Sequence, residues 1–206
     1  MMILKKTDLD PTDARSNRPI SDLSVLSKLL ERLVAKQFVT YLRDNSLLPD
    51  RQSAYRSHHS TETAVLRVLA EILLALDTGN LAVLTLLDLS AAFNSVDHDI
   101  LLQRLQMSYG LGGGVLGWFR SYLNGRTQYV RSSTTSSTPS SVLYGVPQGS
   151  ILFLLYTADL LQLINCHQLH PHAYADDTQI YGFCNPSDAD LLQERMSVCV
   201  DEVCYG

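Results

Sequence analysis

The sequence predicts an α/β (α+β) fold, with helices packed on a central sheet, and three observations lead to this prediction. Apolar side chains in residues 22–44 recur at helical spacing, while most of the basic residues there fall on other positions. Residues 82–89 form a nearly continuous apolar run with Asp88 at its C-terminal end, which is typical of a strand buried on both faces. Strand-prone stretches flank Asp176-Asp177 and predict a hairpin with two acids at its tip.

Capping and turn residues delimit the other elements. Ser60 or Thr61 can cap a second helix that stops before Gly79, and Asp97 can cap a helix over residues 100–109. Three further segments are expected: a strand-like stretch at residues 126–131, a glycine-framed turn at residues 145–150 that opens onto a helix reaching about residue 164, and a final helix over residues 187–203.

Size and composition indicate one globular domain, or one domain plus a fragment, with an uneven distribution of charge. The 206 residues can bury a proper core, and 46% hydrophobic with 18% charged residues argue against wholesale disorder. Residues 1–67 hold eleven of the sixteen basic side chains against eight acidic ones, whereas residues 68–206 hold five against thirteen. A basic N-terminal part and an acidic C-terminal part are consistent with a surface that binds a polyanion and a site that binds metal ions. The alternative is that the charges form two solvated faces without a binding role.

The chain is expected to be soluble and to have no membrane contact. Its most apolar stretch, residues 151–164, is too short to span a bilayer and is interrupted by Asp159 and Gln162. The four cysteines form no CxxC pair and indicate thiols in a reducing compartment.

Three acidic residues form the candidate catalytic centre. Asp176 and Asp177 are adjacent like charges in a tight turn, and a divalent cation is the usual compensation for such repulsion. Oxygen ligands of this kind suit magnesium. Asp88 lies at a strand end, where open α/β sheets place ligands. A solvated Asp-Asp turn and a helix-capping role for Asp88 are the alternative interpretations.

Five short segments, taken together and in their order along the chain, are specific for a protein family. They are Arg18-Pro19-Ile20-Ser21, Gln52-Ser53-Ala54-Tyr55-Arg56, Leu87-Asp88-Leu89-Ser90-Ala91-Ala92-Phe93, Gly145-Val146-Pro147-Gln148-Gly149-Ser150 and Tyr174-Ala175-Asp176-Asp177. With this set, nearly the whole chain resembles the reverse transcriptase of non-LTR (LINE-type) retrotransposons, especially the chicken-repeat-1 and LINE-2 groups.

The resemblance implies a right-hand polymerase fold, with fingers mainly in residues 1–80 and the palm mainly in residues 81–206. The family's acids that match Asp88, Asp176 and Asp177 are catalytic and hold two Mg²⁺ ions. One ion activates the primer 3′-hydroxyl, and the other neutralises the triphosphate and the leaving pyrophosphate. The implied activity is RNA-directed DNA polymerisation, and the implied partners are template RNA, a DNA primer and deoxynucleoside triphosphates.

The resemblance also implies roles for residues outside the acidic centre. Arg18 matches a fingers residue that meets the triphosphate. Phe93 matches an aromatic gate that excludes a ribose 2′-hydroxyl, with core packing as the alternative. Gln148 and Gly149 match the segment that lies against the template and the incoming nucleotide, and Tyr174 is expected to contact the template or primer.

Departures from the family pattern leave a second interpretation open. No aromatic residue directly precedes Arg18, Asn94 stands where the family commonly has aspartate, and about four residues, or one helical turn, are missing after Leu152. The family's motif D and thumb are expected to be absent. The second interpretation is a catalytically dead, nucleic-acid-binding remnant of a degraded element copy. By family habit, the expected compartment is the nucleus or the cytoplasm.

Overall fold

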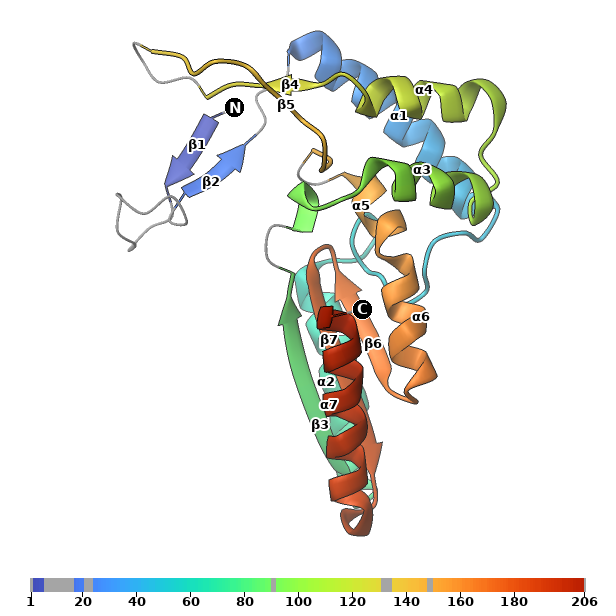
Figure 1. Cartoon of the computed structure of the whole chain (residues 1–206). Coiled ribbons are helices and arrows are strands. Elements are labelled where there is room, and N and C mark those ends of the chain that lie inside the picture. Colours follow the sequence, from blue (N-terminus) through green and yellow to red (C-terminus); the bar gives the residue numbers. More distant parts are fainter. Residues whose placement is uncertain are drawn as a thin grey trace. The chain divides into compact units, whose positions relative to one another are not determined.

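The computed structural model describes residues 2–5, 17–20, 24–89, 92–130, 135–147 and 150–205, with side chains from Ser24 to Cys204. The chain divides into two compact units, residues 1–47 with 93–150 and residues 48–92 with 151–206 (Figure 1). The elements are β1 (Met2–Lys5), β2 (Asn17–Ile20), α1 (Val25–Asp44), α2 (Thr61–Asp77), β3 (Leu81–Asp88), η2 (Ala92–Asn94), α3 (His98–Met107), α4 (Gly113–Leu123), β4 (Thr127–Gln128), β5 (Ser140–Ser141), α5 (Ile151–Tyr156), α6 (Ala158–Cys166), β6 (His170–Tyr174), β7 (Asp177–Cys184), η3 (Pro186–Asp188) and α7 (Ala189–Tyr205). This composition confirms the predicted mixture of helices and strands.

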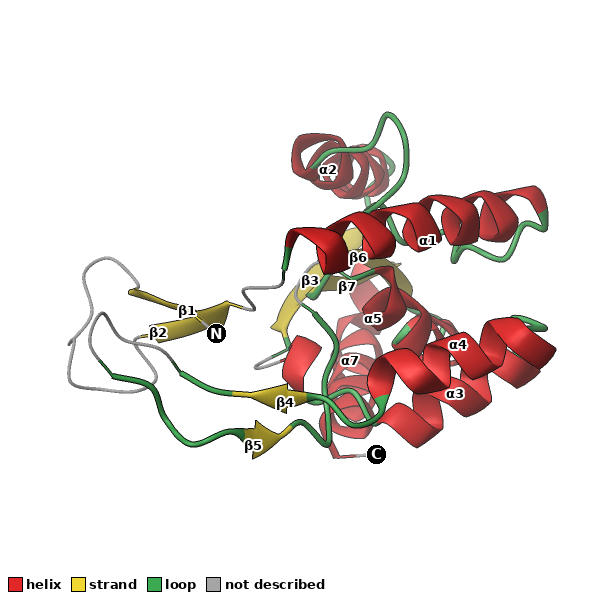
Figure 2. Cartoon of the chain, turned by 90° about the horizontal axis from the view of Figure 1, so that it is seen from above, coloured by secondary structure: helices red, strands yellow, loops and turns green. Residues whose placement is uncertain are grey.

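The unit of residues 48–92 and 151–206 is built on an antiparallel sheet with the strand order β3-β7-β6 (Figure 1). Neighbouring strand residues point to opposite faces. On one face Ile180 packs with residues of α6 and α7, and on the other Tyr181 reaches Glu71 of α2. Figure 2 shows α2 and α7 on opposite sides of the strands. The core beneath α6 and α7 contains the buried side chains Ile164, Leu169, Ile180, Leu192, Met196 and Cys199.

The predicted hairpin around Asp176 is confirmed. A two-residue turn, Ala175-Asp176, joins β6 to β7, and Tyr174 and Asp177 face each other at the strand ends. Turns of this length favour a positive φ at the first position, and Ala175 adopts a φ of 58°.

The prediction that the strand in residues 82–89 is buried on both faces is wrong. β3 lies at an edge of the sheet, and its residues Leu84 and Leu86 are 45% and 69% exposed. An antiparallel sheet can leave one face in solvent, whereas the prediction assumed a sheet covered on both sides. The apolar run therefore indicates the strand correctly but not its burial.

Capping residues set the beginnings of α2 and α3. The Ser60 hydroxyl accepts the Thr63 N–H at 3.3 Å, and the Thr63 hydroxyl accepts the Ser60 N–H at 2.8 Å, which forms a reciprocal capping box. Asp97 Oδ1 accepts the N–H groups of Asp99 and Ile100 at the start of α3. Both predicted caps are confirmed, although α3 begins at His98 and not at residue 100.

The helix expected to continue to about residue 164 is interrupted. α5 ends at Tyr156, α6 begins at Ala158, and Thr157 between them adopts φ −96° and ψ 6°. The Thr157 hydroxyl donates to the Phe153 carbonyl at 3.1 Å, a local bond by which threonine competes with the helical ladder. The expectation of one continuous helix is therefore wrong.

The unit of residues 1–47 and 93–150 contains α1, α3 and α4. Phe38 of α1 and Phe119 of α4 lie 5.2 Å apart between ring centroids, and the Tyr41 hydroxyl donates to the Tyr109 carbonyl at 2.9 Å. The predicted apolar stripe of α1 is buried only in its C-terminal half, since Leu26 is 75% exposed.

Two short antiparallel ladders, β1 with β2 and β4 with β5, belong to this same unit. The strand-like stretch expected at residues 126–131 is limited to Thr127–Gln128 within the part of it that is described. No helix in the described ranges is both long and apolar enough to cross a membrane.

Candidate active site

The three predicted catalytic acids meet at one end of the antiparallel sheet. Asp88, the last residue of β3, lies directly opposite Asp177, the first residue of β7. Directly opposite residues in antiparallel strands have Cα atoms about 5 Å apart and side chains on the same face. Asp176 precedes Asp177 in the turn. The acids come together because one strand ends where its antiparallel neighbour begins.

The carboxylates of this centre repel one another. Asp177 is an exposed residue, and the slight desolvation of its carboxyl, followed by the charges of Asp176 and Asp88, raises the pKa of this group above its usual range. The same environment would favour a cation, because a positive charge among the acids would remove the repulsion.

The donor chemistry of the three acids fits a hard divalent cation, since each offers only oxygen atoms. Within the part of the chain that the structure describes, no three His, Cys, Asp or Glu side chains lie close enough to hold a metal ion together. Backbone register makes Asp88 and Asp177 neighbours, and binding an ion would require the acidic side chains to turn toward one another.

Two tyrosines interact with the acids. Tyr174 of β6 lies opposite Asp177 and is partly buried. Tyr55 adopts a φ of 61°, which is uncommon for a bulky residue. Tyr55 is 42% exposed, and partial desolvation of its hydroxyl, followed by the charge of Asp176, raises the pKa of that hydroxyl. Tyr55 has no role predicted from the sequence, and its left-handed backbone conformation leaves no sequence pattern.

A second missed feature is the segment of residues 51–53. Its backbone exchanges hydrogen bonds with Ala173 and so adds a short parallel bridge to β6. Within it, the buried side chain of Gln52 accepts the N–H of Ala175 in the acidic turn. In the sequence, residues 52–56 stand out only as one of the five ordered segments, and no local pattern there indicates this contact.

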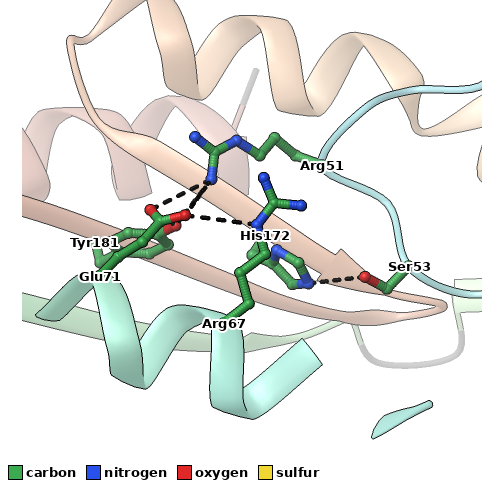
Figure 3. Close-up of polar contacts among 6 residues, drawn as sticks. All are labelled: Arg51, Ser53, Arg67, Glu71, His172 and Tyr181. Atoms are coloured by element: carbon green, nitrogen blue, oxygen red, sulfur yellow. Dashed lines mark hydrogen bonds and ion pairs between the residues drawn. The ribbon is translucent and has the colours of Figure 1, made fainter. Parts of the chain in front are cut away.

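A charged cluster ties the same segment to α2 and β7 (Figure 3). Glu71 accepts hydrogen bonds from Arg51 at 2.9 Å, from Tyr181 at 2.6 Å and from Arg67 at 3.5 Å. Burial opposes the ionisation of Glu71, but the hydrogen bonds from Tyr181 and Arg51 outweigh it and lower its pKa. Burial and the bond to Glu71 raise the pKa of Tyr181. The cluster therefore joins α2, β7 and residues 51–53 through one carboxylate.

His172 is a buried neutral histidine on the same face of the sheet. It is 1% exposed, and its Nε2 lies 3.0 Å from the Ser53 hydroxyl (Figure 3). Its Nδ1 has no hydrogen-bond partner among the described residues. Burial above all lowers its pKa to about 4. The charged or titratable groups around it are Arg67, Arg51 and His59, which lower the pKa further, and Glu71, which opposes them.

We expect acid to destabilise the fold through His172. A histidine in the unfolded chain has a pKa of about 6.5, so the unfolded state binds more protons than the folded state between this value and the folded pKa of about 4. The free energy of unfolding should therefore fall as the pH falls through this window, by about 2–3 kcal/mol at its lower end. Urea unfolding at several pH values measures this loss.

His172→Gln should remove most of this pH dependence, whereas His58→Asn should retain it. His58 is exposed and adopts a φ of 65°, a conformation that asparagine tolerates. Equal pH slopes in the wild-type chain and in His172→Gln would contradict the assignment.

The remaining predicted nucleotide-binding residues belong to the other compact unit. Phe93 lies in η2, is partly buried, and accepts the Val146 N–H on its carbonyl at 2.7 Å. Gln148 and Gly149 lie outside the described residues, and only the backbone of Arg18, in β2, is described. Phe93 is thus in contact with the turn that leads to Gln148.

Comparisons with known proteins identify the family to which the chain is similar. A family model described as "Reverse transcriptase (RNA-dependent DNA polymerase)" matches residues 3–203. The chain is 34% identical over 209 residues to the "Probable RNA-directed DNA polymerase from transposon BS" of Drosophila melanogaster, across 96% of this chain and 23% of that protein. It is 38% identical over 151 residues to the "Probable RNA-directed DNA polymerase from transposon X-element" of the same species, across 71% of this chain and 16% of the relative. It is 29% identical over 189 residues to the "RNA-directed DNA polymerase from mobile element jockey" of that species, across 87% of this chain and 20% of that protein.

This chain spans less than a quarter of the length of these relatives. Among solved structures, the apo telomerase from Candida tropicalis, truncated from its C-terminal domain, aligns with a TM-score of 0.56 and 14% identity. The alignment covers 84% of this chain and 36% of the telomerase chain, and it shows a right-hand polymerase fold. Enzymes of the matched family generally use divalent metal ions.

Proposed function

The chain belongs to the reverse transcriptase (RNA-dependent DNA polymerase) family, and we propose that it is the RNA-directed DNA polymerase of a non-LTR retrotransposon. In this proposal it extends a DNA primer along template RNA with deoxynucleoside triphosphates. The observation that supports it most directly is the position of Asp88 opposite Asp177, with Asp176 in the adjoining turn.

Asp88, Asp176 and Asp177 are the proposed catalytic and metal-holding residues, with Mg²⁺ as the cofactor. Bound Mg²⁺ supplies positive charge against the triphosphate and the leaving pyrophosphate, and lowers the pKa of the primer 3′-hydroxyl. The protein's own part is to hold three carboxylates at a fixed end of a sheet. Backbone pairing of β3 with β7 provides that fixed end, so that only the acidic side chains, and not the strands, would have to move when an ion binds.

Further residues complete the proposed nucleotide and template site. The Arg18 guanidinium binds the triphosphate, Phe93 excludes a ribose 2′-hydroxyl, and Gln148 with Gly149 contacts the template and the incoming nucleotide. Tyr174, which lies opposite Asp177, contacts the template or primer. The proposed fingers lie mainly in residues 1–80 and the proposed palm mainly in residues 81–206.

Primer extension on an RNA template, with Mg²⁺ and deoxynucleoside triphosphates, tests the proposed function. The wild-type chain should add nucleotides, and Asp88→Asn should add none above background. Asp201→Asn is the matched control, because it removes an exposed carboxylate of α7, away from the acidic turn in the sequence and outside the sheet. A chain that unfolds cooperatively and binds RNA in a salt-dependent way, but adds no nucleotide, would instead be the inactive remnant.

A further inference from the structure

Gln52 has a buried polar side chain whose hydrogen bonds lead to the acidic turn. The residue is 4% exposed, so its amide oxygen needs partners within the protein. Oε1 accepts the N–H of Ala54 at 3.0 Å and the N–H of Ala175 at 3.2 Å. Because both partners can only donate, the oxygen with its two lone pairs is the amide atom that satisfies them together.

Ala175 is the residue of the turn that most needs support. It lies between Tyr174 and Asp177, which pair with each other, and so falls outside the β6–β7 ladder. Its φ of 58° is a conformation that residues with a Cβ adopt at a cost, and the surrounding structure must maintain it. Because Asp176 follows directly, the backbone of Ala175 sets the direction in which the Asp176 side chain leaves the turn.

Gln52 is itself held from both sides. The preceding residue, Arg51, pairs with Glu71 at 2.9 Å, and the following residue, Ser53, contacts His172 at 3.0 Å (Figure 3). The Ser53 N–H also donates to the Ala173 carbonyl at 2.9 Å. The side chain of Gln52 therefore extends to the turn from a backbone that is anchored to α2 and β6.

We propose that Gln52 is a positioning residue of the active site. By accepting the Ala175 N–H, it holds the turn so that Asp176 and Asp177 keep their places relative to Asp88. Its effect on catalysis rests on the proposed polymerase function, whereas the hydrogen bond to Ala175 does not. Such support matters because displacing a reacting group by about 1 Å can lower a rate on the order of 100-fold.

Gln52→Met tests this proposal, because methionine has a similar length but lacks the amide oxygen. Hydrogen exchange of the Ala175 amide should become faster by at least about 10-fold. The rate constant of primer extension should fall by about 10–100-fold, with the KM for deoxynucleotides within about 2-fold of wild type. The Mg²⁺ concentration at half-maximal rate should rise by about 3–10-fold. A general loss of folding would reduce the amount of active protein but would not change this Mg²⁺ dependence.

Two further variants separate the support of the turn from the stability of the segment. Ser53→Ala removes the contact with His172 but leaves Gln52, so it should lower stability without changing the Mg²⁺ dependence or the exchange of Ala175. Gln52→Glu retains an oxygen acceptor and should retain slow exchange at Ala175. Fast exchange of Ala175 in the wild-type chain would overturn the proposal, as would wild-type exchange and Mg²⁺ dependence in Gln52→Met.

Hydrogen exchange of the Ala175 amide still tests the proposal if Gln52→Met does not fold or if the wild-type chain does not extend primers. If Gln52→Met does not unfold cooperatively, slow exchange in both the wild-type chain and Gln52→Glu supports the role of Gln52, and fast exchange in Gln52→Glu overturns it. If the folded wild-type chain does not extend primers, the polymerase function fails, and the exchange rates of Ala175 still decide whether Gln52 holds the turn.

Discussion

Asp176→Asn is expected to lower the rate of primer extension at least about 1000-fold. Asparagine preserves the shape of the side chain and suits a turn, so the backbone should keep its conformation. It replaces a carboxylate by a neutral amide, which is a much weaker ligand for a hard divalent cation. Single-turnover extension with a preformed primer–template complex measures the chemical step without a contribution from product release.

The same substitution should leave the fold intact or stabilise it slightly. The charge of Asp176 contributes to the raised pKa of Asp177, which is a sign of repulsion in the folded state. Relief of this repulsion should raise the free energy of unfolding by about 0.5 kcal/mol, a small value because Asp177 is exposed. Activity and stability would then move in opposite directions, which distinguishes a lost metal ligand from a damaged fold.

Asp201→Asn removes the same charge from an exposed position of α7 and serves as the matched control. It should extend primers at the wild-type rate and change the free energy of unfolding by less than about 0.5 kcal/mol. An Asp176→Asn chain that keeps its rate within about 10-fold of wild type would contradict the assignment of Asp176 as a metal-holding residue.

The acidic centre could be predicted from the sequence because most of it is local. Strand-prone stretches on both sides place Asp176 and Asp177 at a turn, and an apolar run that ends at Asp88 places the third acid at a strand end. The register of β3 with β7 brings Asp88 to Asp177, and this register pairs residues that are far apart in the sequence. Periodicity and turn chemistry do not contain this register, and only the resemblance to a known family, whose matching acids act together, implies it.

The hydrogen bonds that hold the segments around this centre could not be predicted in the same way. Gln52 bonds to a residue 123 positions later in the chain, through a bridge to β6 that no local pattern encodes. Tyr181 meets Glu71 over a separation of 110 positions. The exposure of Leu86 also depends on topology, because an apolar run reads the same whether its strand is central or at an edge.

Gly145→Ala is expected to lower the free energy of unfolding by about 3 kcal/mol. Gly145 adopts a φ of 92°, and an added Cβ would lie 2.9 Å from both the Asn94 Cα and the Phe93 carbonyl oxygen. These are backbone atoms, which cannot rotate out of the way as the end of a side chain could. The turn would have to move off η2, and urea unfolding measures the resulting loss of stability.

The displaced turn should also impair nucleotide incorporation through Phe93. The Val146 N–H donates to the Phe93 carbonyl at 2.7 Å, so a shift of the turn should also move Phe93, the proposed gate. Gly117→Ala is the matched control, because Gly117 lies in α4 and an added Cβ there meets nothing within 4 Å. Alanine at this helical position should stabilise the chain by about 0.5–1 kcal/mol and leave extension unchanged. If Gly145→Ala instead unfolds at the wild-type urea concentration and extends primers at the wild-type rate, the close approach of the turn to Phe93 supports neither the fold nor the site.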